Sequence, residues 1–174
     1  MTGRIFKNIA ITASLVLVFI SENLIAQPVL PPRSITVNST QALHFGTFCL
    51  ENSGSSGGTV TVDWQGNRTA TGQVVLLPVA PMHQSAIFEI SLCQGRAVTI
   101  SYPQSIILTG NNGGQMTMEI GPTEKGVSGA SFQVNGDCNF ITQLRVGGKL
   151  FVGSNSSNPG GVYTGEFNIV FNQQ

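Results

Sequence analysis

The chain has 174 residues, of which 41% are hydrophobic and only 9% are charged. The length fits one globular domain, and the charged fraction lies far below the roughly 25% of an average domain. The formal net charge is zero, so the chain lacks the field that would attract nucleic acid or an anionic membrane. With its 21 glycines, the composition favours a turn-rich β protein and predicts no nucleic-acid partner.

The first 26 residues have the pattern of a secretory signal peptide. Arg4 and Lys7 are positively charged, residues 9–20 form an apolar run, and residues 24–26 precede the predicted cleavage point. The apolar run is shorter than the ~20 residues that a membrane-spanning helix requires. We therefore predict a cleaved signal peptide, no transmembrane segment in the mature chain, and export to the periplasm, the cell surface or the extracellular space.

The next segment is rich in proline. Residues 27–33 contain Pro28, Pro31 and Pro32 and show no periodic pattern, so we expect an extended leader. From Ile35 onward apolar residues recur at every second position, which is typical of β-strands because their alternate side chains point to opposite faces. The predicted organisation is a signal peptide over residues 1–26, a proline-rich leader over 27–33 and a single β-sandwich domain over 34–174.

The first predicted strands form two hairpins. Residues 59–64 alternate and lead through a turn at 65–67 into a run that ends at residues 74–77. Residues 88–92 and 98–102 also alternate, and the turn between them holds Cys93.

Three further strands complete the pattern. A turn at residues 111–114 precedes a strand over 116–120. The strand over residues 144–152 contains Gly147 and Gly148, which predict a bulge or a close backbone approach. The last strand places alternating apolar residues on one face: Tyr163, Phe167, Ile169 and Phe171. Strands separated by Gly, Asn and Pro turns indicate an antiparallel sandwich or barrel, and we favour the two-sheet sandwich.

Three cysteines permit one disulfide and leave one thiol: Cys49, Cys93 and Cys138. Their spacing matches no zinc or redox motif, and an exported chain favours disulfide formation. If the strands form an up-and-down meander from residue 59, Cys93 and Cys138 lie at the same end and Cys49 at the other. We therefore predict a Cys93–Cys138 disulfide.

No catalytic, cofactor-binding or metal site is predicted. Residues 54–58 match the G-x-S-x-G motif around Ser56, but the motif requires a strand-turn-helix corner and here precedes a strand. His44 and His83 have no second ligand at metal-binding spacing. The aromatic residues Trp64 and Tyr102, like Tyr163, share the parity of aliphatic neighbours, so we expect all three to pack in the core rather than to form a sugar-binding platform.

Several short stretches together resemble the bacterial "domain of unknown function 4402" family. The stretches are residues 44–48, 57–62, 68–72, 108–110, 146–150 and 163–167. Lys149 stands where the family usually has threonine, and the pair Cys93 and Cys138 is a local addition. The family is similar to spore-coat-U-type and chaperone-usher pilin domains. This resemblance implies an immunoglobulin-like antiparallel β-sandwich on an exported surface protein, with no active-site residues to carry over.

These observations predict a non-catalytic secreted or cell-surface module of fimbrial-subunit or adhesin type, with no cofactor. We expect its partners to be other surface or fimbrial subunits, bound through strand edges. Residues 34–40, or the last strand, are the candidates for such β-augmentation. A carbohydrate- or ligand-binding sandwich is the alternative, and a hydrolase that uses Ser56 is the third possibility.

Overall fold

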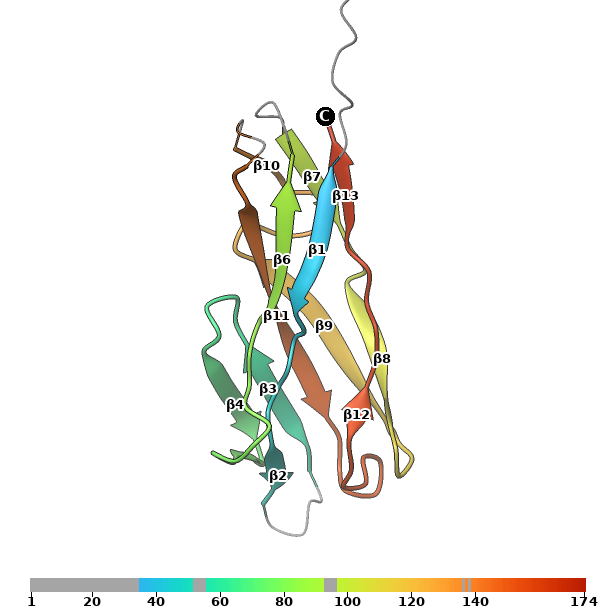
Figure 1. The fold of residues 1–174 in the computed structure, drawn as a ribbon. Helices are drawn as coiled ribbons and strands as arrows, with labels where there is room; N and C mark the ends of the chain where they lie inside the picture. Colours follow the sequence, from blue (N-terminus) through green and yellow to red (C-terminus); the bar gives the residue numbers. More distant parts are fainter. Residues whose placement is uncertain (1–34, 52–55, 93–96, 136, 138) are drawn as a thin grey trace, which may run out of the picture. The chain divides into compact units, whose positions relative to one another are not determined.

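The computed structural model describes residues 35–51, 56–92, 97–135, 137 and 139–174. The predicted signal peptide and leader lie outside these residues. Every regular element in the described part is a strand (Figure 1). The strands are β1 (Thr36–Gln41), β2 (Phe48–Leu50), β3 (Gly58–Val62), β4 (Arg68–Gly72), β5 (Val74–Leu76), β6 (Ala86–Ser91), β7 (Ala97–Ser101), β8 (Ser105–Gly110), β9 (Gln115–Thr123), β10 (Ser131–Gln133), β11 (Thr142–Val152), β12 (Tyr163–Thr164) and β13 (Val170–Gln173).

The strands form three antiparallel sheets. The largest has the order β1-β6-β11-β9-β8-β12, with β3 paired to both β11 and β4. The second has the order β10-β7-β13, and the third is the β2-β5 ribbon. Side chains from β6 and β11 of the first sheet and from β7 of the second meet in one core, where Ile90, Leu144 and Ile100 are fully buried. The predicted all-β antiparallel sandwich is therefore confirmed.

Strand β11 joins the two halves of the large sheet. Along one edge it pairs with β6 through residues 142–146 and with β3 through residues 148–152. The register against β9 shifts between Val146 and Gly148, which confirms the predicted bulge. A Cβ at Gly147 would lie 2.6 Å from the carbonyl oxygen of Val62, so only glycine fits this close backbone approach.

The first predicted hairpin is confirmed, and the second is wrong. Strands β3 and β4 pair directly, with Thr59 opposite Thr71. Strands β6 and β7, in contrast, belong to different sheets: β6 lies between β1 and β11, and β7 lies between β10 and β13. The predicted up-and-down meander is wrong for the same reason. Alternation identifies the buried face of a strand but not the neighbour with which the strand pairs.

Two further predictions concern the cysteines and the aromatic residues. Cys93 and Cys138 lie outside the described residues, so their disulfide stays a prediction, although the meander that suggested it is not present. Trp64 does not continue β3 into the core. It lies half-buried in the turn between Asp63 and Asn67, where the backbone of Asp63 bonds to that of Asn67. Tyr102 is buried as predicted, and Tyr163 is half-buried.

Candidate functional site

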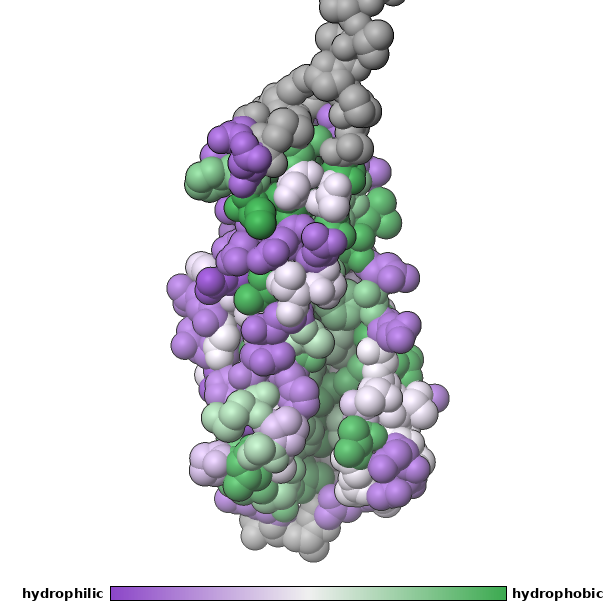
Figure 2. Space-filling view, in the orientation of Figure 1, coloured by the Kyte–Doolittle hydropathy of each residue, from purple (hydrophilic) through white to green (hydrophobic). Residues whose placement is uncertain are grey.

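A continuous groove runs between the two ends of the described chain. One side, the N-terminal wall, is formed by residues 37–50, and the other side, the C-terminal wall, by residues 161–171. The upper part has a volume of about 560 Å³ and the lower chamber a volume of about 580 Å³. Leu43, Gly165 and Phe167 line both parts, so the two form one opening, which we call the edge groove. Apolar residues line this hollow in Figure 2.

The floor of the lower chamber belongs to the core of the large sheet. Inward-facing residues of β8, β9 and β11 form it: Leu108, Met116, Met118, Leu150 and Val152. Each of these side chains is buried, with at most 7% of its surface exposed. The groove therefore opens directly onto the hydrophobic core, where an ordinary sandwich would be covered by a further strand.

The N-terminal wall is a series of strand edges. Among the described residues, β1 pairs only with β6, and β2 pairs only with β5. Between these strands, the backbone of His44 pairs with that of Gln84 in both directions, at 2.9 and 2.8 Å. These hydrogen bonds hold the wall to the rest of the fold from the side away from the groove. The edge that borders the groove is left without a strand partner.

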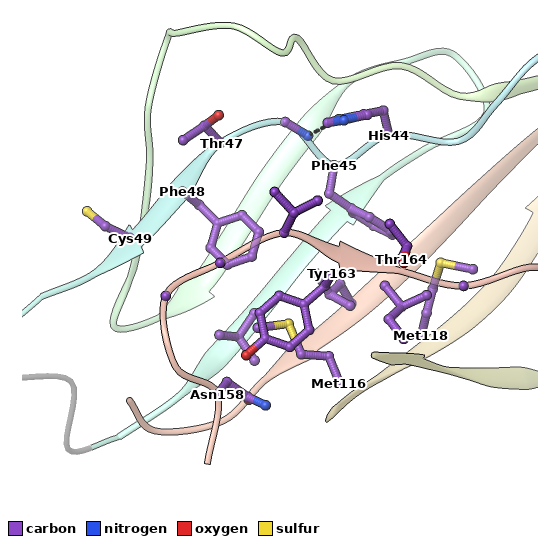
Figure 3. A pocket seen from close by; sticks show the side chains of 18 of the residues that line it. His44, Phe45, Thr47, Phe48, Cys49, Met116, Met118, Asn158, Tyr163 and Thr164 are labelled. Carbon is purple, nitrogen blue, oxygen red and sulfur yellow. Dashed lines mark hydrogen bonds between the residues drawn. The ribbon is translucent and has the colours of Figure 1, made fainter. Parts of the chain in front are cut away.

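Arg68 on β4 fixes the lower half of this wall. One guanidinium nitrogen donates hydrogen bonds to the carbonyls of Phe45 and Thr47, at 3.1 and 3.2 Å, and the other donates to the carbonyl of Leu77 at 3.1 Å. The wall bends at Gly46, whose φ is 73° and whose N–H donates to Nδ1 of His44 at 2.9 Å. The bend and the clamp keep Phe45 and Phe48 directed into the chamber (Figure 3).

The C-terminal wall passes from one sheet to the other. β12 pairs with β8 in the large sheet, and β13 pairs with β7 in the second sheet. Residues 165–169, which connect them, belong to no strand. Phe167 and Phe171 pack against Phe88 of β6, with ring centroids 6.5 and 6.1 Å apart, and hold the connection onto the core. Residues 165–169 line the upper part of the groove.

Polar contacts hold the mouth of the chamber. The hydroxyl of Tyr163 donates to the carbonyl of Pro159 at 2.8 Å. The buried amide of Asn158 donates to the carbonyl of Gln115 at 2.6 Å and accepts a hydrogen bond from the N–H of Gly153. Figure 3 shows the Tyr163 ring inside the chamber with its hydroxyl on the side of Asn158, whereas Cys49 points away from the chamber. The chamber thus has an aromatic and aliphatic interior with polar groups at its rim.

The groove carries very little charge. Glu166 is the one carboxylate among the lining residues, and it is exposed at the rim. The pKa values of Asp63 and Tyr102 are shifted, but neither residue lines the groove. Burial acts to raise the pKa of Asp63, but hydrogen bonds from Asn67, Gln65 and Gly66 together hold it below its ordinary value. Burial raises the pKa of Tyr102, against a smaller lowering by a hydrogen bond with Ser128. An apolar, uncharged occupant fits this groove best.

The structure does not bring the predicted catalytic candidates together. Ser56 is exposed at the start of β3, and its backbone N–H donates to Oε1 of Gln73 at 3.2 Å. His44 belongs to the N-terminal wall, and Nδ1 of His83 is buried without a hydrogen-bond partner. Within the described ranges, no three His, Cys, Asp or Glu side chains gather where they could hold a metal ion. Cys49 is an exposed free thiol.

Sequence reasoning identified parts of the groove but missed the groove itself. The sequence predicts that residues 34–40, or the last strand, pair with a strand of another subunit. The structure places β1 and residues 165–173 on opposite sides of one opening and pairs β1 with β6 of its own chain. Residues 42–50 were not recognised as part of a wall. The sequence contains one usable signal, because Leu43 and Phe45, and again Phe48 and Leu50, are apolar at alternate positions on the two sides of Gly46.

The comparison with known families covers nearly all of the described chain. Residues 35–172 match the model of the family described as "Domain of unknown function (DUF4402)". The chain belongs to this family. The DUF4402 match spans both walls and the floor of the edge groove, so the groove lies within the domain. No curated protein matches the chain. In the part of the DUF4402 chain that the structure describes, no helix has the length and apolar character needed to cross a membrane.

Proposed function

We propose that this chain is an exported, non-catalytic structural or adhesion module of fimbrial-subunit type, which joins other surface subunits through its strand edges. The observation that carries the proposal is the edge groove, in which the edge of β1 and the irregular segment 165–169 flank an apolar opening that reaches the core. Open edges are templates for pairing with another chain, and soluble proteins usually protect them. An apolar groove beside such an edge favours β-augmentation as the mode of assembly.

The sequence adds support for the compartment. The predicted signal peptide over residues 1–26 directs the chain out of the cytoplasm, where surface subunits assemble. The resemblance of the family to spore-coat-U-type and pilin domains points to the same class of protein. The edges would serve as the functional surfaces, and no reaction would be required.

The proposal is tested in the cells that produce the protein. An antibody against residues 35–174 would follow the chain through fractionation, protease treatment of intact cells and chemical cross-linking. We expect a chain of mature length outside the cytoplasm, accessible to protease and cross-linked into larger species. Ser39→Glu, which places a charge in the groove, should reduce these species, whereas Thr36→Glu, on the outer face of β1 and opposite Ser91, should not. An uncleaved intracellular chain, or a monomer under all conditions, would contradict the proposal.

One observation favours the alternative of a ligand-binding sandwich. The chamber volume of about 580 Å³ lies within the roughly 300–1,000 Å³ of small-molecule sites, and Tyr163 offers an aromatic face with a hydroxyl. A glycan array with the purified mature chain tests this function. Specific glycan binding that Tyr163→Ala abolishes would support it, with Tyr163→Phe as the control that keeps the ring and removes the hydroxyl.

A further inference from the structure

We infer that the edge groove binds one extended strand of a different polypeptide, which is free of proline over about seven residues, uncharged, and apolar at every second position. The inference rests on the proposed function and names the chemistry of the partner. It also assigns the lower chamber to a large apolar side chain at one end of that strand. The occupant would complete the sandwich between β1 and β13.

The walls set the length and the hydrogen bonding of the occupant. In the upper part, residues 37–43 lie opposite residues 165–171, so each wall offers seven residues. Seven extended residues span roughly 23 Å at ~3.3 Å per residue. The groove-facing edge of β1 has no partner strand, and residues 165–169 belong to no sheet. A strand between them would form hydrogen bonds on both sides, so it requires N–H groups along its whole length.

The side chains on the groove set the pattern of the occupant. Val37, Phe88 and Phe171 present apolar surface toward the upper part. A strand between the walls would turn alternate side chains toward this surface and the others toward water. Among the described lining residues, Glu166, which is exposed at the rim, is the one carboxylate, and none is lysine or arginine. A charge of either sign turned toward the apolar surface would lose its hydration without a paired ion, which is costly.

The lower chamber explains why one end of the occupant carries a large side chain. Phe48 and Tyr163 flank a space of about 580 Å³ above Met116 and Met118 (Figure 3). Methionine side chains adapt to irregular neighbours, so this floor accommodates an aromatic or long aliphatic group. A bulky side chain in the chamber would also fix the register of the strand, which a uniform edge specifies weakly.

Two other occupants fit the groove less well. An acyl chain would fill the apolar space but would leave the edge N–H and C=O groups unpaired, which is costly for groups shielded from water. The leader of a second copy has the right location in the sequence, immediately before β1. Its residues 27–34 include Pro28, Pro31 and Pro32, and proline has no N–H and is restricted to positions where none is needed.

Peptide binding to the purified mature chain tests the inference. The probe is a fluorescein-labelled nine-residue peptide, Phe-Thr-Val-Thr-Val-Thr-Val-Thr-Val, measured by fluorescence anisotropy. We expect saturable binding that weakens at least tenfold when alternate backbone nitrogens are methylated, and at least tenfold when Phe is replaced by Ala. A peptide of residues 27–34 and dodecanoate serve as competitors, and both should displace the probe poorly. Tighter binding of either competitor, or equal binding of the methylated peptide, would overturn the inference.

Variants of the protein locate the binding site. Ser39→Glu on the groove face of β1 should weaken probe binding at least tenfold, and Thr36→Glu, on the outer face of the same strand and opposite Ser91, should leave it within twofold. Both residues are exposed, so neither change threatens the fold, and circular dichroism confirms this. The peptide measurement requires neither export nor assembly. Peptide binding without surface assembly in cells therefore overturns the proposed function alone, and assembly without strand binding overturns this inference alone.

Discussion

Arg68 connects β4 to the N-terminal wall, and its removal should destabilise the fold measurably. In Arg68→Ala, the carbonyls of Phe45 and Leu77 lose their hydrogen bonds to the guanidinium, whereas that of Thr47 keeps a bond from the N–H of Leu77 at 3.0 Å. A hydrogen bond to a charged group stabilises by about 1.5–3 kcal/mol. Arg68 is half-buried, so water replaces part of this loss. We expect a decrease of about 2–4 kcal/mol in the free energy of unfolding.

Urea denaturation of the mature chain, followed by Trp64 fluorescence, measures this effect. Arg145→Ala is the matched control, because no side-chain hydrogen bond of Arg145 is found among the described residues. Arg68→Lys keeps the charge but not the planar fork that reaches three carbonyls, and it should recover less than half of the loss. If Arg68→Ala and Arg145→Ala differ by less than about 0.5 kcal/mol, the range of an ordinary surface substitution, the clamp does not hold the wall.

Three further predictions concern the close approach at β11, the β3–β4 turn and the free thiol. Gly147→Ala should lower the free energy of unfolding by about 1–3 kcal/mol, because its Cβ would lie 2.6 Å from a backbone oxygen. Gly160→Ala is the control, because the space around its new Cβ is open. Equal decreases of the thermal unfolding midpoint in the two variants would refute this prediction. The folded-state pKa of Asp63 lies below 3.8, so its carboxylate stabilises the fold above that pH and the contribution disappears as the pH falls through the folded-state pKa. Acid titrations of the wild type and Asp63→Asn should therefore converge at low pH, and parallel curves would refute the reasoning. Maleimide should label Cys49 in the native chain, since this thiol is exposed; peptide mapping that finds Cys49 protected would contradict the structure.

Which side chains of each strand are buried could be predicted from the sequence. Leu144 and Val146 on β11, like Ile90 on β6, alternate with polar residues and are fully buried. The pleat of a strand forces this outcome whichever strand lies beside it. The predicted last strand is wrong as one continuous element, because β12 and β13 join different sheets and residues 165–169 between them belong to no strand. Phe167, Ile169 and Phe171 of its predicted inner face are nevertheless half-buried.

The pairing of the strands could not be predicted in the same way. The eleven residues of β11 pair with β6, β3 and β9. No local sequence pattern identifies a strand that has three partners. The error over β6 and β7 has the same origin, since a hairpin and a crossing between sheets present equal alternation. The edge groove depends on these pairings, so it emerges only when the topology is known.

The two walls of the groove come from segments more than 100 residues apart in the sequence, and this has a consequence for when the groove exists. Residues 37–50 leave the ribosome well before residues 161–171. A chain that stops before residue 161 retains the first wall and has nothing opposite it. Any partner that recognises both walls at once therefore recognises only molecules in which both segments have been made, and shorter copies are excluded from assembly without a separate checkpoint.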